Sequence, residues 1–174
     1  MKIWRKIYMT FWRLGWKLRS RRAQGLQLGE TFPDFSLRDL EGKAHRLSDL
    51  SSARYTVLWF TNFCQDCRAR IPLLNELLQK AGENVRILAV SILDKDDPLP
   101  RQVAPECFFP ILLDPEDVVG LKLGLAHPPN ACPFHNLFVV SSSGQVAFRH
   151  HLSALGPENF RSLWNRLTAE IAQN

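Results

Sequence analysis

Two cysteines separated by two residues, Cys64 and Cys67, are the side chains of this sequence best suited to chemistry. They follow a strongly apolar run, 55–63, and precede a segment with helical spacing, 68–78. A strand, a dithiol and a helix in this order would place Cys64 at a helix N-terminus, where unpaired N–H groups and the helix dipole favour a thiolate. The thiolate is the nucleophile of thiol–disulfide exchange, and Cys67 is close enough to form a disulfide with it. The spacing therefore predicts a redox-active pair.

Two other interpretations fit a Cys-x-x-Cys pair, namely half of a zinc site and a pair of buried, unreactive thiols. A four-cysteine zinc site needs a second such pair, whereas Cys107 and Cys132 are each single. Redox chemistry is therefore favoured over both alternatives. Cys107 stands beside Phe108 and Phe109 and is expected to act as a small buried apolar residue.

The residues around the pair resemble a known family. Residues 28–43, LGETFPDFSLRDLEGK, and 47–50, LSDL, resemble the opening of the AhpC/TSA redoxins, which include peroxiredoxins and thiol–disulfide reductases of the TlpA/ResA kind. Residues 59–68, WFTNFCQDCR, resemble the reductase version, and Pro72 matches the early proline of its active-site helix. The resemblance covers about residues 28–172. It implies a thioredoxin-like fold and exchange of disulfides.

The family also places a loop against the dithiol, and this sequence departs from the family pattern there. The reductase pattern reads Pro-x-x-Phe-x-x-x-x-x-Gly, with the proline in the cis form. When the pattern is aligned on Phe138 and Gly144, His135 falls at the proline, and Pro133 lies two residues earlier. Peroxiredoxins have Arg at this position. Either His135 replaces the proline, or the loop is longer by two residues and Pro133 is the cis residue.

Peroxide reduction is a second activity that the resemblance brings in. Peroxiredoxins carry Pro-x-x-x-Thr-x-x-Cys, in which the Thr and the Arg hold the peroxide against the cysteine. Thr61 has the matching offset from Cys64, but Val57 stands where the proline would be. A peroxidase needs the whole geometry rather than one matching residue, so dithiol exchange remains the favoured activity.

Cys132 and His135 add a third thiol and an imidazole to the same loop. Near the dithiol, His135 would accept a thiol proton or, as a cation, favour the thiolate, and Cys132 would resolve a mixed disulfide. The set Cys64, Cys67, Cys132 and His135 also suits a soft metal such as Cu(I) or Zn(II). Sco-type copper chaperones use two cysteines and a histidine in this fold, although their cysteines are separated by three residues rather than two. The simplest alternative is that both residues only fill the loop, and no cofactor is expected.

The first 25 residues form a basic segment that differs from the rest of the sequence. They contain eight Lys or Arg and no acid, whereas the remainder has 14 basic and 17 acidic residues, a balance of −3. On a helical wheel, one stripe contains Ile3, Trp4, Ile7, Phe11, Leu14 and Leu18, and the opposite side contains Lys2, Lys6, Arg13 and Lys17. Together with Trp12 and Trp16, this pattern favours a helix over 2–18 lying in the plane of an anionic membrane surface, with the cytoplasmic face preferred.

Other interpretations of the basic segment remain open. Its longest uncharged run, 7–12, is too short to span a bilayer, and it lacks the apolar region of a secretory signal. It also fits an organelle presequence, or a segment that binds a partner or folds back on the domain. Nucleic acid is not an expected partner, because the rest of the chain is acidic.

Patterning of the remainder predicts one thioredoxin-like α/β domain, 26–174, in which helices flank a mixed sheet. Strands are expected at 35–38, 44–46, 55–61, 85–92, 111–113, 136–141 and 145–149. Helices are expected at 68–81, 115–123 and 157–172, the last with Leu163, Leu167 and Ile171 facing inward. The stretch 94–110 holds four prolines and is expected to be mostly loop.

These residues predict a reaction with two protein partners. Cys64 would attack a disulfide in a substrate protein, Cys67 would resolve the mixed disulfide, and an external dithiol reductant would restore the pair. Asp66 disfavours the Cys64 thiolate, which points to a reducing role. Some thioredoxins place a buried acid beneath the dithiol, but Leu58 occupies that strand position here. Proton transfer is then left to water, His135 or Glu76.

Overall fold

A seven-stranded mixed sheet is the centre of the fold in the computed structural model, which describes residues 26–124 and 135–172. Its strands lie in the order β2-β1-β5-β4-β3-β6-β7. β3 runs parallel to β4 and β4 to β5, whereas the other neighbouring pairs are antiparallel. The bounds are β1 Ser36–Asp39, β2 Ala44–Arg46, β3 Tyr55–Thr61, β4 Val85–Ser91, β5 Ile111–Leu113, β6 Leu137–Ser141 and β7 Val146–His150.

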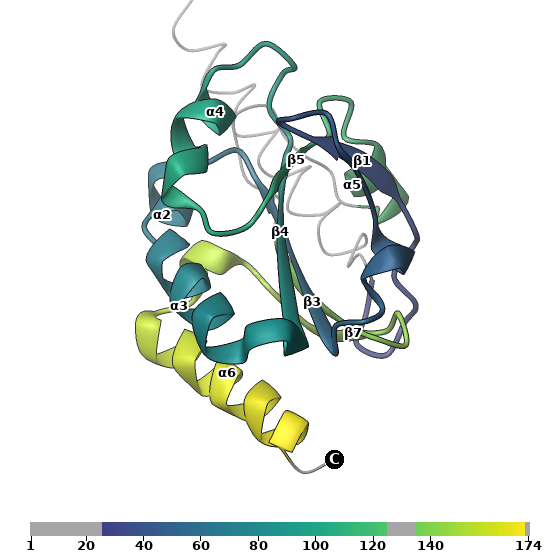
Figure 1. Cartoon of the computed structure of the whole chain (residues 1–174), viewed down its shortest axis with the longest axis vertical. Coiled ribbons are helices and arrows are strands. Elements are labelled where there is room, and N and C mark those ends of the chain that lie inside the picture. The colour runs from purple at the N-terminus through teal and green to yellow at the C-terminus, as the bar shows by residue number, and fades with distance from the viewer. Residues whose placement is uncertain (1–25, 125–134, 173–174) are drawn as a thin grey trace, which may run out of the picture.

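The two central strands owe their place to nearly continuous apolar sequence. Every residue of β3 is buried, and in β4 only Arg86 is exposed. Strands of this kind need cover on both faces, and helices supply it. α3 (Ile71–Ala81), α6 (Pro157–Ala172) and α4 (Leu99–Val103) cover one face, and α5 (Val118–Lys122) covers the other (Figure 1).

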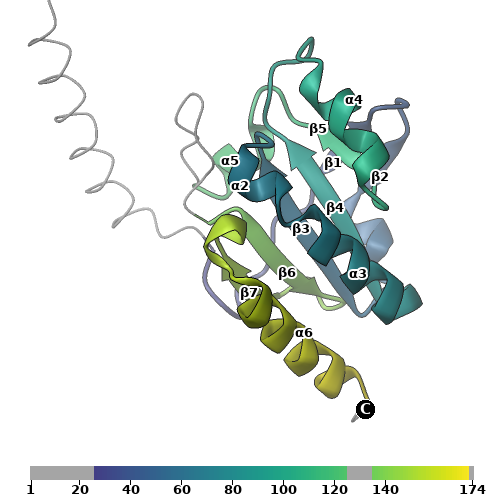
Figure 2. The same ribbon diagram turned by 90° about the vertical axis from the view of Figure 1, so that its left-hand side faces the viewer.

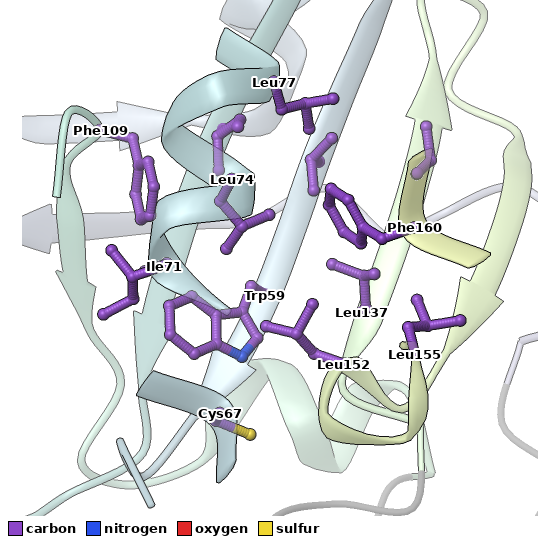
Figure 3. Packing of buried hydrophobic residues seen from close by; sticks show 14 of the residues in the cluster. Trp59, Cys67, Ile71, Leu74, Leu77, Phe109, Leu137, Leu152, Leu155 and Phe160 are labelled. Atoms are coloured by element: carbon purple, nitrogen blue, oxygen red, sulfur yellow. The ribbon is translucent and has the colours of Figure 1, made fainter. Parts of the chain in front are cut away.

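Alternate residues of β3 divide the core into two layers. Val57 and Trp59 belong to the layer under α3 and α6, and Leu58 and Phe60 belong to the layer on the α5 side. The helices α3 and α6 lie side by side over the first layer (Figure 2). Cys67 lies at the end of this layer, close to Trp59 (Figure 3). The Cys64–Cys67 pair is therefore packed against this layer, and Leu58 lies on the opposite face of the sheet.

The helix expected over 68–81 is divided into two. α2 spans Gln65–Arg68 and α3 begins at Ile71, with Pro72 in its first turn. A proline in the first turn gives up no helical hydrogen bond, because that N–H has no partner within the helix. The expectation that Pro72 lies near the start of a helix is confirmed.

The expectation that 94–110 is mostly loop is wrong in part. α4 spans Leu99–Val103, and a 3₁₀ turn, η3, follows at Ala104–Glu106. Pro98 precedes α4, while Pro100 and Pro105 occupy first-turn positions in the two elements. Prolines at these positions start helical turns instead of breaking them. Further 3₁₀ turns are η1 Leu47–Leu50, η2 Gly82–Asn84 and η4 Leu152–Ala154.

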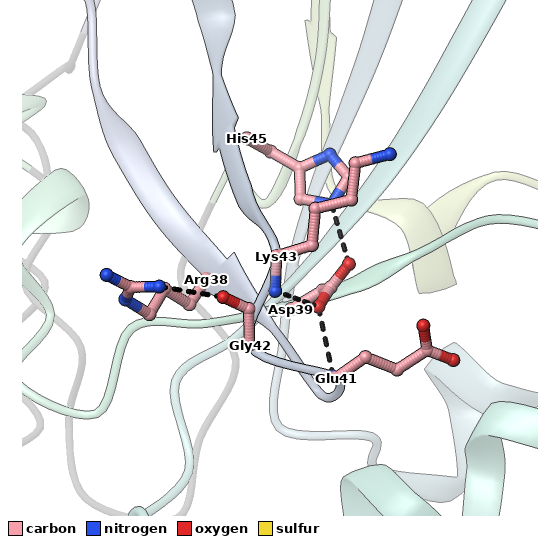
Figure 4. Close-up of polar contacts among 6 residues, drawn as sticks. All are labelled: Arg38, Asp39, Glu41, Gly42, Lys43 and His45. Carbon is pink, nitrogen blue, oxygen red and sulfur yellow. Dashed lines mark hydrogen bonds and ion pairs between the residues drawn. The ribbon is translucent and has the colours of Figure 1, made fainter.

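The Asp39 carboxylate organises the β1–β2 hairpin (Figure 4). Its oxygens accept the backbone N–H groups of Glu41 (3.0 Å) and Lys43 (2.9 Å), and its other contact is with the His45 ring at 2.7 Å. Gly42 adopts φ +86°, a left-handed conformation that glycine takes without strain. The two strands expected at 35–38 and 44–46 thus pair as an antiparallel hairpin.

The start of the described domain pairs with the first residue of β7 on the outer edge of the sheet. Gly29 N–H donates to the carbonyl of Val146 (2.8 Å), and Val146 N–H donates to the carbonyl of Glu30 (2.9 Å). Arg149 holds the same segment through the carbonyl of Leu26 (2.9 Å). Residues 26–31 therefore lie along this edge of the sheet, next to the start of β7.

Several expectations fall outside the described residues. They include the amphipathic helix of the basic segment, at 2–18, together with Cys132 and Pro133. In α6, Leu163 is buried as expected, and the side chains of Leu167 and Ile171 are not described. The division into a basic segment, 1–25, and a domain, 26–174, remains a prediction.

Leu74 tests how firmly the helix behind the dithiol is packed. It lies in α3 with no exposed surface, so Leu74→Ala should lower the free energy of unfolding by about 2–5 kcal/mol, through lost burial and a residual cavity. Leu121→Ala, also in a helix but with a 69% exposed side chain, should change it by less than about 0.5 kcal/mol. Urea titration followed by circular dichroism measures both. Equal losses in the two variants would contradict the packing described.

Candidate active site

A tight change of direction at the end of β3 places the first cysteine. The Thr61 hydroxyl oxygen accepts the N–H of Phe63 at 2.8 Å, and the Asn62 side-chain oxygen accepts the N–H of Cys64 at 3.1 Å. Phe63 adopts φ +53°, which is uncommon for a bulky residue. Its ring is buried and packs edge-on against Trp59, with centroids 5.6 Å apart. Side-chain hydrogen bonds and core packing together hold this turn.

Cys64 stands at the start of α2 as its N-cap residue. It is partly exposed, and its carbonyl accepts the N–H of Arg68 at 2.9 Å. The free N–H groups of a first helical turn favour an anionic sulfur at this place. Position and access therefore suit Cys64 to make the first nucleophilic attack.

Cys67 differs from Cys64 in its burial and in its hydrogen-bond partner. It has no exposed surface, and it packs in the core layer under α3 and α6. A donor reaches its sulfur from another element, because Asn136 Nδ2 lies 3.5 Å from Cys67 Sγ. The first residue of the pair is therefore partly exposed, and the second is fully buried.

Asn136 is a buried polar residue in contact with Cys67 that the sequence did not single out. It lies directly before β6 with no exposed surface, and its side-chain oxygen accepts the N–H of Leu152 at 2.7 Å. Its own carbonyl accepts the N–H of Phe60 at 2.7 Å. The sequence did contain one signal for this residue. Asn136 is a polar residue directly before an apolar strand, and it ends the loop that the family places against the dithiol.

Two histidines near the dithiol favour the uncharged ring. Burial lowers the pKa of His135 from its usual 6.5, and the charges of Arg149, His150 and His151 lower it further. Burial and His150 also lower the pKa of His151, against an opposite effect of the Asp66 carboxylate. Of the two roles predicted for His135, proton acceptor is thus favoured over cation. Asp66, in the first turn of α2, is exposed, and its charge acts on His151.

The other predicted residues have definite places. Thr61 is buried, and its oxygen takes part in the turn before Cys64, while Glu76 forms a surface ion pair with Lys80 at 2.6 Å. Cys107 packs against the core as expected, but it is only partly buried. Within residues 26–124 and 135–172 no peptide bond is cis, and no three His, Cys, Asp or Glu side chains meet in a group able to hold a metal. The four-residue metal set includes Cys132, outside those ranges, and stays untested.

Comparison with known proteins decides the family. The AhpC/TSA family matches residues 28–149. This chain belongs to the AhpC/TSA family. Over 125 residues it is 34% identical to thiol-disulfide oxidoreductase ResA of Geobacillus thermodenitrificans, in a match that covers 68% of this chain and 66% of the relative. The chain thus spans just under two thirds of that relative's length.

Solved structures show the same fold. A Chlorobium tepidum protein described as a thiol:disulfide interchange protein, DsbE, superposes with a TM-score of 0.66 at 23% identity, over 83% of this chain and 97% of that one. Peroxidoxin BcpB from Mycobacterium tuberculosis gives 0.65 at 20% identity, over 80% and 94%. These findings confirm the thioredoxin-like fold and the family, and the names of the relatives support an oxidoreductase. The fold alone does not separate reductase from peroxidase.

Cys107 should be much less reactive than the dithiol. Burial, and next the charge of Glu106, raise the pKa of its thiol to about 11, so roughly one molecule in a thousand carries the thiolate at pH 8. In the reduced protein, iodoacetamide at pH 8 should label Cys64 first and Cys107 far more slowly, with the Cys107 rate rising about tenfold per pH unit up to pH 11. Peptide mass spectrometry measures each rate. Labelling of Cys107 as fast as Cys64 would contradict this assignment.

Proposed function

We propose that this protein is a thiol–disulfide oxidoreductase that uses Cys64 as nucleophile and Cys67 as resolving cysteine. The observation that carries the proposal is the asymmetry of the pair: Cys64 is partly exposed at the start of a helix, whereas Cys67 is fully buried one turn later. A partner's disulfide can reach the first sulfur but not the second. The family membership and the name of the Geobacillus relative point to the same chemistry.

The reaction follows from this geometry. The Cys64 thiolate attacks one sulfur of a partner disulfide; a new S–S bond forms, the old one breaks, and the other partner sulfur leaves as a thiolate that takes up a proton. Cys67 then loses its proton and attacks Cys64 Sγ, which releases the second partner thiol and leaves Cys64–Cys67 oxidised. The partner has gained two electrons, and an external dithiol must supply them again. The Asp66 carboxylate close to Cys64 favours this reducing direction.

Peroxide chemistry receives less support from the site. Thr61, the residue that matched the peroxiredoxin pattern, is buried, and its oxygen already accepts the N–H of Phe63. This hydrogen bond gives Thr61 a structural role in the turn before Cys64 that does not require peroxide binding. We therefore retain disulfide exchange as the function.

The basic segment supports a membrane-surface location for this activity. Within the described ranges no helix is long and apolar enough to cross a bilayer. Residues 2–18 carry an apolar stripe and a basic face, which suits a helix lying on anionic lipid. We infer that this segment brings the dithiol to disulfides of proteins at the membrane, on the cytoplasmic face.

Cysteine substitutions test the proposed reaction. Cys64→Ser should reduce insulin reduction with dithiothreitol by at least about a hundredfold, because the attacking sulfur is lost. Cys67→Ser should form a mixed disulfide that persists until dithiothreitol is added, since nothing in the pair resolves it. Non-reducing electrophoresis and mass spectrometry identify that adduct. Cys107→Ser is the matched control and should keep full activity; full activity of Cys64→Ser would refute the proposal.

Vesicle binding tests the proposed location. The full chain should sediment with vesicles rich in phosphatidylserine and not with pure phosphatidylcholine, and 1 M salt should release it, because screening shortens the Debye length to about 3 Å. Changing Lys2, Lys6, Arg13 and Lys17 to Gln should weaken binding at least about a hundredfold, at about 1 kcal/mol for each basic residue. The control changes four exposed domain residues to Gln, namely Lys43, Lys95, Arg101 and Lys122. Equal weakening in both variants would exclude the basic segment as the contact.

A further inference from the structure

Asn136 has both ends of its side chain fixed in the protein interior. Its oxygen accepts the backbone N–H of Leu152 at 2.7 Å. Because that partner can only donate, the amide cannot be turned around, and Nδ2 must face the Cys67 sulfur 3.5 Å away. The side chain has no exposed surface, so water does not compete for either contact. The orientation of the donor toward sulfur is therefore imposed by the backbone of another element.

The contact gains strength when Cys67 loses its proton. A thiol sulfur is a weak acceptor, whereas a hydrogen bond to an anionic acceptor is about twice as strong as a neutral one. Full burial by itself opposes ionisation of Cys67. A fixed N–H donor offsets part of that cost only in the ionised state. An amide does this at every pH, because it does not titrate in the range where proteins are folded.

Among the described residues, Cys67 receives the amide donor of Asn136, and no acid occupies strand position 58. Leu58 occupies the strand position where some thioredoxins have an acid, and it lies in the opposite core layer. The Trp59 indole N–H has no exposed surface and no hydrogen-bond partner among the described residues. In Figure 3 the indole nitrogen lies on the side of the ring toward Cys67.

Titratable groups approach the pair from three elements. Asp66 and Arg68 flank Cys67 on α2, His135 precedes Asn136, and His151 precedes η4 and is acted on by the Asp66 charge. Asn136→Ala changes none of these titratable side chains, and a readout of each reaction phase separates the loss of the amide from a general disturbance of the site.

We propose that Asn136 is a positioning residue for the resolving step: its amide holds the Cys67 sulfur and stabilises the thiolate that attacks the mixed disulfide. This inference rests on the proposed function and adds a residue to it. In that step the Cys67–Cys64 bond forms, the bond from Cys64 to the partner breaks, and the departing partner sulfur takes up one proton as Cys67 gives one up. Asn136 transfers no proton.

A two-phase thiol titration measures the step directly. One equivalent of 5,5′-dithiobis(2-nitrobenzoate) added to the reduced full chain should release nitrothiobenzoate twice, first on attack by Cys64 and then on resolution by Cys67. Asn136→Ala should slow the second phase roughly ten- to hundredfold at pH 7, as expected for loss of a hydrogen bond to a charged group. The midpoint of its pH dependence should rise by at least about one unit. The first phase should change by less than about twofold.

Asn75→Ala is a matched control. Asn75 also joins two segments through both ends of its amide, donating to the Glu106 carbonyl at 2.8 Å and accepting the N–H of Phe108 at 3.0 Å. It contacts backbone rather than sulfur in both bonds, so its loss should leave both phases unchanged. Equal slowing of the second phase in the two variants, or equal slowing of both phases in Asn136→Ala, would overturn the inference in favour of a structural role.

A measurement on the unaltered protein covers the case in which Asn136→Ala does not fold. The ¹⁵N and ¹H resonances of the Asn136 side-chain amide should move with pH at the midpoint of the second phase in reduced full-length protein. An amide that does not move there overturns the inference. If the unaltered protein releases only one equivalent, the proposed function fails as well, whereas two normal phases in Asn136→Ala refute only the role of Asn136.

Discussion

The turn at residues 61–64 is the constraint on which the site depends. A bulky residue with φ +53° costs on the order of 1–3 kcal/mol, and Phe63 accepts this conformation because its ring is buried against Trp59. Two side-chain oxygens, from Thr61 and Asn62, accept the N–H groups that the turn would otherwise leave unpaired. With the turn held, Cys64 begins α2 at the surface. Cys67, one turn later, necessarily points back into the core.

This arrangement gives the two thiols different surroundings without placing a charge beneath them. Cys64 lies among the N–H groups of a helix start, and Cys67 receives an amide donor from Asn136. The nearby His135 and His151 are biased toward uncharged rings, mainly by burial. In the mechanism that we propose, these fixed dipoles take the place of ionised groups, and they keep their effect across the pH range in which histidines change charge.

The sequence was sufficient to predict most of the fold, and the reasons are physical. β3, β5 and α6 lie at their predicted bounds because their apolar patterns are long or sharply delimited by turn residues. The error in 94–110 arose from treating each proline as a helix breaker, when Pro98 and Pro100 instead begin α4. In the site, Cys64 and Cys67 were found from spacing alone. Asn136 was not, since its contact with Cys67 joins residues 69 positions apart that only the folded sheet brings together.

The pairing at the outer edge of the sheet also limits how a partner can approach. Many proteins bind extended peptides by adding them as an extra strand to a free sheet edge. Here residues 29–31 already occupy hydrogen-bonding positions beside Gln145 and Val146, and the opposite edge is the three-residue β2. A partner that binds as an extra strand would have to displace residues 29–31 at one edge. At the other edge, the short β2 would offer it few hydrogen bonds. In the function that we propose, a partner's extended segment would then reach Cys64 without adding a strand to the sheet.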